Sequence, residues 1–269
     1  MPSPADPTAI EIGAISIRWY ALFILLGIIT AIWLARELAS RRGMDPEFIL
    51  DIAPLVVVSG LIGARAYYVL LRLDYFTDHP SEIINIRLGG MTIHGAIVTG
   101  VFMLAYLCRR RGESLLRWSD VIVPGLALAQ AIGRWGNWAN QEAFGTPSDL
   151  PWAVEISPRR RPDEYPNAAT FHPTFLYESI ANVVIAAALC WIVLRIPTDR
   201  HLREGDALWV YLIAYGTVRF FIERIRTDSL YIGPLPAAYW ISFGLVGIGV
   251  AGILYSRYAR PPSPVASPA

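Results

Sequence analysis

Seven long apolar runs, separated by short polar connections, set the pattern of this chain. They cover residues 19–34, 49–71, 94–108, 121–132, 175–194, 207–222 and 237–255. At 1.5 Å of rise per residue, most of them are long enough to cross, or nearly cross, a hydrocarbon core of about 30 Å. We therefore predict an all-α fold, a polytopic membrane bundle of seven transmembrane helices. The third and fourth runs give the weakest signals, because polar residues extend them at one end.

Composition supports this interpretation. Hydrophobic residues make up 54% of the 269 residues, charged residues only 17%, and the mean hydropathy is +0.42. An ordinary soluble domain is about 45–50% apolar and roughly one quarter charged. The first run lacks an Ala-x-Ala cleavage signal and is longer than the core of a signal peptide, so we expect an uncleaved first helix. We expect the lipid bilayer as a partner, and no nucleic acid.

The distribution of arginine predicts the orientation, since all 23 basic residues are arginine. One set of connections carries twelve of them: Arg36, Arg41, Arg42, Arg109, Arg110, Arg111, Arg117, Arg195, Arg200, Arg203, Arg257 and Arg260. The opposite set carries Arg18, Arg72, Arg87, Arg224, Arg226 and the run 159–161. The three arginines at 159–161 oppose the positive-inside rule, but they lie in a long loop, and charges in long loops have little influence on topology. The positive-inside rule then places the N-terminus outside and the C-terminus in the cytoplasm.

The chain is expected to form a single transmembrane domain over residues 1–269. Its connection 138–173 is rich in proline and polar residues and predicts a small extracytoplasmic cap, with a strand at 151–156. The segment 261–269, rich in proline and serine, predicts a disordered tail.

Polar groups inside the predicted helices gather in one layer, the outer leaflet. Six helices contribute to it, with Arg18, Trp19, Tyr20, Arg65, His94, Arg134, Asn137, Glu142, His172, Tyr177, Glu178, Tyr215, Arg219, Glu223 and Arg226. The four-residue spacing of Tyr215, Arg219 and Glu223 puts them on one helix stripe. Burying a guanidinium in lipid costs at least a few kcal/mol, so an intramembrane arginine is a functional hypothesis with an anionic partner to be found.

Each of these residues also has a structural interpretation. Arg65 and Arg219 can hold the bundle together by pairing with Glu178 or Glu223. Aromatic residues such as Tyr20 are typical of the membrane interface. His172, at a helix start before a proline, can be structural rather than catalytic. Residues 159–161 can form a solvated loop or contact lipid headgroups. His94 follows two glycines, and an imidazole with a pKa near 6.5 suits proton transfer, although a structural histidine is the alternative.

Four segments carry a resemblance to a known family. They are GGMTIHG at 89–95, GRWGNWANQE at 133–142 with Gly145, HPTFLYE at 172–178, and YGTVRF at 215–220 with Glu223. They resemble the bacterial phosphatidylglycerol–prolipoprotein diacylglyceryl transferases, over residues 17–255. The Gly-Arg-x-Gly-Asn-aromatic-x-Asn-x-Glu-x-x-Gly pattern is specific to that family. Two departures are Trp138, where Phe is common, and Ala64, where a second glycine is common.

The resemblance implies a reaction. The diacylglyceryl group of phosphatidylglycerol moves to the thiol of a lipobox cysteine in a prolipoprotein signal peptide, leaving a thioether and releasing glycerol 1-phosphate. This is the first step of lipoprotein maturation, with the active site facing the outer leaflet of the bacterial plasma membrane and no cofactor. The residues agree, because the nucleophile belongs to the substrate. The chain offers no outer cysteine, since Cys108 and Cys190 fall near predicted cytoplasmic helix ends.

The leaving group is a phosphate ester, and arginine donates paired hydrogen bonds to phosphate while staying charged. We therefore expect Arg134 and Arg219 to hold the phosphate, with neutral hydrogen bonds from Asn137 and Tyr20. Preset donors of this kind supply a few kcal/mol each to catalysis.

The predicted site has further members with other roles. Glu142 and Glu223 fix the geometry of the arginines, and His94 is the candidate base for the incoming thiol. An alternative is that the positive cluster itself lowers the pKa of the thiol, about 8.5 when free. The predicted substrate-binding set is completed by Tyr215, Arg226, Gly145 and Arg65.

Two rival functions remain. A non-enzymatic carrier of lipids or anions at the outer leaflet also needs an arginine pocket, but it should continue with polar groups to the inner side, which is largely apolar here. An intramembrane protease is a poorer match, because the chain has no Gly-x-Ser-Gly, His-Glu-x-x-His or Glu-Glu pair. Four scattered histidines give no metal site.

Overall fold

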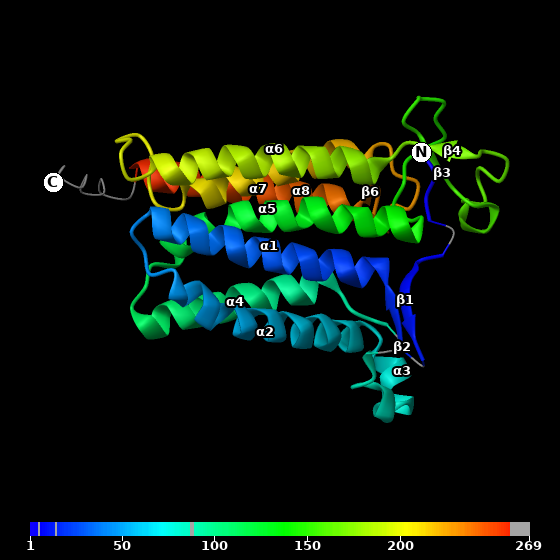
Figure 1. Ribbon diagram of the computed structural model, residues 1–269, viewed down its shortest axis with the longest axis horizontal. Helices are drawn as coiled ribbons and strands as arrows, with labels where there is room; N and C mark the ends of the chain where they lie inside the picture. The colour runs from blue at the N-terminus through cyan, green and yellow to red at the C-terminus, as the bar shows by residue number, and fades with distance from the viewer. Residues whose placement is uncertain (5, 14, 87–88, 259–269) are drawn as a thin grey trace. The chain divides into compact units, whose positions relative to one another are not determined.

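The computed structural model describes residues 1–4, 6–13, 15–86 and 89–258, and the fold is helical. Eight α-helices occur in this part of the chain (Figure 1): α1 (Trp19–Arg41), α2 (Glu47–Leu71), α3 (Leu73–Asp78), α4 (Ile93–Arg111), α5 (Leu115–Asn140), α6 (Thr174–Arg195), α7 (Asp206–Glu223) and α8 (Ala237–Tyr258). The predicted tail 261–269, together with Arg87 and Arg260, lies outside the described residues.

Each of the seven predicted apolar runs falls within one long helix, so their helical structure and order are confirmed. Five of them, α1, α2, α5, α6 and α8, are long and apolar enough to cross a membrane. The expectation of a weak third run holds for α4, which ends on three arginines. The fourth run, α5, does qualify, and it is α7 that does not. Its 18 residues include three charged side chains, Asp206, Arg219 and Glu223.

In the described part of the chain, three short antiparallel strand pairs accompany the helices. The pairs are β1 (Thr8–Ile12) with β2 (Ile15–Arg18), β3 (Val154–Glu155) with β4 (Thr170–Phe171), and β5 (Tyr231–Ile232) with β6 (Leu235–Pro236). The strand expected at 151–156 is therefore present but only two residues long. Phe171 and Val154 belong to a small apolar core that holds the cap together.

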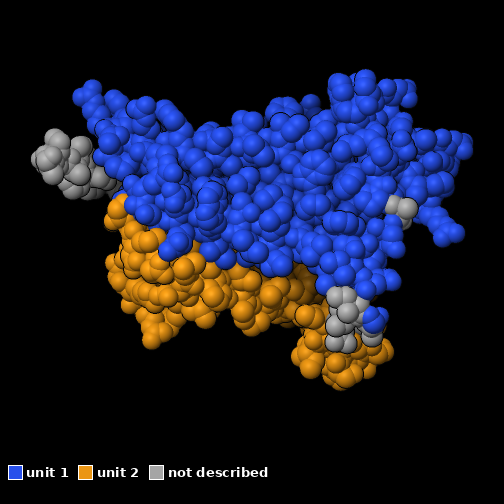
Figure 2. All heavy atoms as spheres, viewed as in Figure 1, with its two compact units in different colours: residues 1–42, 119–269 blue, residues 43–118 orange. Residues whose placement is uncertain are grey.

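The chain divides into two compact units, coloured separately in Figure 2. Unit 1 comprises residues 1–42 and 119–269, and unit 2 comprises residues 43–118. Unit 1 contains α1, α5 from residue 119 onward, and α6–α8, which lie roughly parallel in Figure 1. Unit 2 contains α2, α3, the 3₁₀ turn η1 (Pro80–Glu82) and α4.

Small residues let the helices of unit 1 approach closely. A Cβ atom on Gly249 of α8 would come within 2.7 Å of the carbonyl oxygen of Trp209 in α7. A Cβ on Gly125 of α5 would lie 2.6 Å from the carbonyl oxygen of Ala31 in α1. Such contacts are typical of helices that pack in a membrane, where small residues permit close backbone contact.

A buried carboxylate organises the end of unit 1 opposite the cap. Asp120 of α5 is fully buried and accepts hydrogen bonds from the backbone N–H groups of Gly205 (2.7 Å) and Leu208 (3.2 Å). These N–H groups lie at the start of α7, where backbone N–H groups have no acceptor within the helix. Asp120 therefore caps α7 and fixes its axial position against α5, which in turn sets the position of the arginine at the other end of α7.

Candidate functional site

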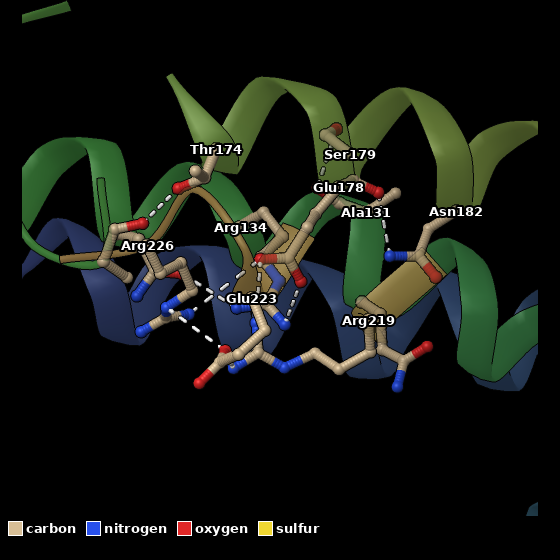
Figure 3. Close-up of polar contacts among 12 residues, drawn as sticks. Ala131, Arg134, Thr174, Glu178, Ser179, Asn182, Arg219, Glu223 and Arg226 are labelled. Carbon is tan, nitrogen blue, oxygen red and sulfur yellow. Dashed lines mark hydrogen bonds and ion pairs between the residues drawn. The ribbon is translucent and has the colours of Figure 1, made fainter. Parts of the chain in front are cut away.

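Three helices of unit 1 bring charged side chains together at the end nearest the cap. Arg134 comes from the last turns of α5, Glu178 from the second turn of α6, and Arg219 with Glu223 from the end of α7. Arg226 follows α7 directly. Figure 3 shows these side chains pointing toward one another between the three helices. The predicted stripe on the sixth long helix is confirmed by the Arg219–Glu223 pair, whose Nη2 and Oε2 atoms are 2.6 Å apart.

Glu178 is the centre of this cluster. Its side chain is 2% exposed, and its Oε2 lies 2.5 Å from Nη2 of Arg134. Its Oε1 lies 3.7 Å from Nη1 of Arg219 and 4.0 Å from Nη1 of Arg226. One buried carboxylate thus holds three guanidinium groups from two helices and a loop in a fixed arrangement.

Asp228 and Glu223 complete the pairing of Arg226. The Nε and Nη2 atoms of Arg226 donate to the two carboxylate oxygens of Asp228 at 2.9 and 2.7 Å, a two-point contact. Burial disfavours the charged form of Arg226, but the bonds to Asp228 and the charges of Glu178 and Glu223 outweigh it and raise the pKa of this guanidinium above its ordinary value. Arg226 therefore stays charged at every pH at which the protein is handled.

The cluster is electrically balanced. Three guanidinium groups, Arg134, Arg219 and Arg226, face three carboxylates, Glu178, Glu223 and Asp228. The pairing of Arg219 with both glutamates is the structural alternative that the sequence left open. Not every donor is used, however. Nη1 of Arg219 is buried without a hydrogen bond in the described chain, and Nη1 of Arg134 has only a 3.5 Å contact with Oδ1 of Asn137.

Asn137 and Glu142 form a second, linked contact beside Arg134. Nδ2 of Asn137 donates to Oε1 of Glu142 at 3.0 Å, and Nδ2 of Asn140 reaches the same oxygen at 3.2 Å. Glu142 therefore orients the amide of Asn137, and its effect on Arg134 passes through that amide. The flanking residues Gln141 and Ala143 both have left-handed φ angles, 52° and 57°. Such angles are uncommon in residues other than glycine and indicate a backbone held by its surroundings.

Tyr20 packs against the same part of α5. A Cβ atom on Gly136 would overlap the Tyr20 ring, so the ring lies directly on the helix backbone there. Tyr20 is close enough to Glu142 and Arg134 for electrostatic interaction with both. The second glycine of the Gly-Arg-x-Gly-Asn pattern, Gly136, thus has a steric role: it lets Tyr20 of α1 pack against α5 beside Arg134.

Gly145 permits close approach of its own backbone to the segments that carry His172 and Arg226. Its N–H donates to the carbonyl of His172 at 2.9 Å, and it forms a β-bridge with Arg226. A Cβ atom here would come within 2.8 Å of the carbonyl oxygen of Ile225. Gly145 therefore sets the path of the segment that carries Arg226 and has a structural contribution besides any contact with substrate.

Tyr215 lies one turn before Arg219 and stacks on Tyr211, with ring centroids 5.8 Å apart. Tyr211 donates to Oε1 of Gln130 at 3.1 Å, which ties α7 to α5. Tyr215 thus lies on α7 within unit 1, one turn from Arg219 and stacked on a residue that binds α5.

Two predicted site residues, His94 and Arg65, belong to unit 2. His94 is the second residue of α4, and its ring lies 6.5 Å from that of Tyr67 in α2. The side chain of Arg65 faces main-chain carbonyl groups of the segment between α3 and α4. Each is described within its own unit.

Glu178, the central residue, was absent from the predicted set of site residues. The sequence signal was present: an acid one turn inside an apolar helix, in the HPTFLYE segment, needs a cationic partner. Asp228 gave no comparable signal, because an aspartate in a polar connection after a helix is an ordinary residue. Among the described residues, no group of three or more His, Cys, Asp or Glu side chains is arranged to hold a metal ion.

An apolar hollow of about 330 Å³ lies between α1, α5 and α6. Its lining includes Trp135 and Ser179, the neighbours in sequence of Arg134 and Glu178. It is lined by Phe23, Leu26, Leu128, Ala131, Ile132, Trp135, Ser179 and Val183. On its wall the indole N–H of Trp135 donates to Oγ of Ser179 at 3.2 Å, and Ser179 donates to the carbonyl of Ala131 at 3.0 Å. Because these hydrogen bonds satisfy the indole N–H of Trp135 and the hydroxyl of Ser179, the remaining lining is apolar and suited to an alkyl chain.

Comparison with known proteins assigns the chain to a family. Residues 7–255 match the family model described as prolipoprotein diacylglyceryl transferase. Proteins named phosphatidylglycerol–prolipoprotein diacylglyceryl transferase are similar over nearly the whole chain. The one from Synechococcus elongatus is 44% identical, covering 93% of this chain and 86% of the relative, and the one from Gloeobacter violaceus is 41% identical, covering 96% of each.

Proposed function

Since the chain belongs to the prolipoprotein diacylglyceryl transferase family, we propose that it transfers the diacylglyceryl group of phosphatidylglycerol to the lipobox cysteine of prolipoprotein signal peptides. The thiol sulfur attacks the carbon of the diacylglyceryl group that is bonded to the phosphate oxygen. The carbon–oxygen bond breaks, its electron pair stays on the phosphate oxygen, and glycerol 1-phosphate leaves. The product is a thioether, formed in the first step of lipoprotein maturation.

The observation that carries this proposal is the pair of guanidinium nitrogens beside Glu178 that lack a close hydrogen-bond partner. Within the described residues, Nη1 of Arg219 has no hydrogen bond and only a 3.7 Å ion pair with Glu178, and Nη1 of Arg134 has one long hydrogen bond of 3.5 Å. Both side chains keep limited access, with exposed fractions of 17% and 20%. A phosphodiester that enters here meets donors already held in place by carboxylates, so little reorganisation is needed as negative charge grows on the phosphate.

The balanced charge of the cluster favours phosphate binding by hydrogen bonding over simple ion attraction. Glu178 and Glu223 keep the arginines from repelling one another in the empty site, and the donors that remain then select a planar or tetrahedral anion by geometry. Asn137, oriented by Glu142, adds a neutral amide beside Arg134. Tyr20 supplies a hydroxyl from α1 in the same region.

His94 is the proposed base that accepts the thiol proton. An imidazole that is neutral near pH 7 takes up a proton readily, and a thiol whose pKa is about 8.5 needs only modest assistance. The alternative remains that the nearby guanidinium groups alone lower the pKa of the substrate thiol. Tyr215 and Arg226 are proposed to line the entrance for the headgroup or the peptide, and Gly145 the binding site.

We further propose that all seven long helices cross the bacterial plasma membrane as one domain, with the N-terminus outside. The helices α4 and α7 have 19 and 18 residues, about 27 Å of rise, which is close to the thickness of the hydrocarbon core. Their charged residues lie near helix ends. The residues 138–173 then form the cap on the outer side, and the arginine cluster lies in the outer leaflet.

The decisive experiment is incubation of the purified protein in detergent with phosphatidylglycerol labelled in its glycerol backbone and a synthetic peptide containing a lipobox. We expect a diacylglyceryl peptide in equal amount to released glycerol 1-phosphate. A peptide with serine in place of the lipobox cysteine is the matched control and should give no product. Lipid binding or movement without product would instead support the rival function, a carrier of lipids or anions.

A further inference from the structure

Arg65 uses its whole guanidinium group on the protein backbone. It lies in α2 of unit 2 and is 8% exposed. Its Nε donates to the carbonyl of Ile83 at 2.8 Å, and Nη2 donates to those of Glu82 at 2.6 Å and Asn85 at 3.3 Å. Nη1 donates to the carbonyls of Gly89 at 2.7 Å and Gly90 at 3.0 Å.

A guanidinium group has five N–H bonds, and these contacts account for five donors. The rings of Phe76 and Tyr68 also lie near the cation, with their centroids 5.2 and 5.7 Å from its central carbon. A phosphate has no free N–H left to bind. Arg65 therefore differs from Arg134 and Arg219, each of which keeps donors without a close partner.

The segment that Arg65 holds leads directly to His94. Gly89 and Gly90 have left-handed φ angles of 81° and 79°, and a Cβ atom on Gly90 would lie 2.6 Å from Nη1 of Arg65. Two residues later, the backbone N–H and the hydroxyl of Thr92 both donate to the carbonyl of Ala64, each at 3.1 Å. The helix α4 begins at the next residue, and His94 lies in its first turn.

Consecutive residues of α2 thus template the start of α4. Ala64 binds Thr92, Arg65 binds the carbonyls on either side of residues 87–88, and Gly63 allows Gly95 to approach the α2 backbone closely. Loss of the Arg65 guanidinium removes the donor from five carbonyl groups, in hydrogen bonds that are only partly accessible to water. The expected result is a displaced or mobile entry into α4, and with it a displaced His94.

We propose that Arg65 is a positioning residue, which sets the backbone that presents His94 and makes no contact with the phosphate. This assignment replaces the substrate-binding role that the sequence predicts for Arg65, and its catalytic consequence rests on the proposed role of His94. The identity of the side chain matters because lysine, with three donors on one nitrogen, cannot reach carbonyls spread around a planar fork.

The test separates kcat from KM in the Arg65→Lys variant of the full chain. A positioning residue predicts at least a tenfold loss in kcat with the KM for phosphatidylglycerol within about twofold of the parent protein. The matched control is Arg72→Lys, also in this unit and exposed at the end of α2, which should leave both constants unchanged. A tenfold rise in KM with kcat retained would overturn the proposal and return Arg65 to the substrate-binding set.

A second measurement does not depend on activity. Hydrogen exchange of peptides that cover residues 82–95 should be at least tenfold faster in Arg65→Lys than in the parent and in Arg72→Lys. Gly90→Ala, which keeps Arg65 but intrudes on its guanidinium, should produce the same acceleration. Unchanged exchange in both variants would refute the positioning role, whereas faster exchange together with an inactive parent enzyme would leave the positioning role intact and refute the proposed function.

Discussion

Glu178 of α6 and Arg134 of α5 form an ion pair of 2.5 Å in which the carboxylate is almost completely buried. The other oxygen of the same carboxylate faces Arg219 of α7. A single acid therefore links the three helices that supply the proposed phosphate site. Sites that are held rigidly by such a supporting contact keep their donors in place before the substrate arrives.

Glu178→Gln should destabilise the protein and impair catalysis. The amide keeps the shape of the side chain but removes the charge that balances Arg134 and Arg219. Loss of one partner of a buried ion pair costs about 3–5 kcal/mol. Thermal unfolding in detergent should show a clear drop in Tm. Glu37→Gln is the control, because its pair with Arg41 is exposed and such pairs contribute about 0–1 kcal/mol. Equal Tm values for the two variants would contradict the central role of Glu178.

Arg134→Ala should reduce kcat/KM by roughly 100-fold or more, the usual effect of removing one preset donor to developing negative charge. Arg134→Lys should restore little of this loss, since a single ammonium group cannot pair with Glu178 and bind phosphate in the same geometry. Steady-state kinetics with the lipobox peptide measures both. Full activity of the lysine variant would exclude two-point phosphate binding by Arg134. Arg159→Lys, in the exposed part of the cap, should behave like the parent protein.

His94→Gln should lower turnover by roughly 10²–10⁴-fold, the usual contribution of a general base. If His94 is the base, the pH dependence of turnover in the variant should differ from that of the parent protein. The measurement is kcat against pH with saturating lipid and peptide. His79→Gln is the matched control in the same unit, because His79 is exposed and its ring contacts the ring and the carbonyl of Tyr75. A nearly normal rate with an unchanged profile would leave the arginine cluster as the agent that activates the thiol.

Gly136→Ala should inactivate the protein, whereas Gly133→Ala, one turn earlier on the same helix, should not. A Cβ at position 136 would overlap the ring of Tyr20, and overpacking of this kind costs roughly 1–3 kcal/mol. A Cβ at position 133 meets no atom within 4 Å, and replacing a helical glycine by alanine stabilises by up to about 1 kcal/mol. The Tm should therefore fall in Gly136→Ala and rise slightly in Gly133→Ala, and only Gly136→Ala should lose activity. Similar behaviour of both would show that Tyr20 is not held by this contact.

The helices could be predicted because apolar runs of this length have few other structures available. The sixth run shows the limit, since the charged residues that reduce its apolar character, Arg219 and Glu223, pair with each other inside the bundle. Periodicity along one helix predicted that pair. The hairpins at the N-terminus and after α7 gave no strong pattern, because strands of two to five residues are too short for alternation to stand out.

The partners of the site residues were harder to predict than the residues themselves. Arg134 and Arg219 were identified from the cost of burying charge, but the sequence does not determine which acid lies nearest to each. Glu142 was expected to hold an arginine and instead holds the amide of Asn137. Such contacts depend on rotations of helices relative to one another, and on loops such as the one after Asn140, where left-handed residues redirect the chain.

Arg65 recognises oxygens that every amino acid possesses, so the stretch it secures places few demands on the side chains found there. Ile84 lies between Ile83 and Asn85, whose carbonyl groups accept hydrogen bonds from Arg65, and it is 86% exposed. Substitution of Ile84 by cysteine would offer an attachment point for a fluorescent reporter beside the start of α4, and its signal would follow the arrival of lipid or peptide in an otherwise unmodified enzyme.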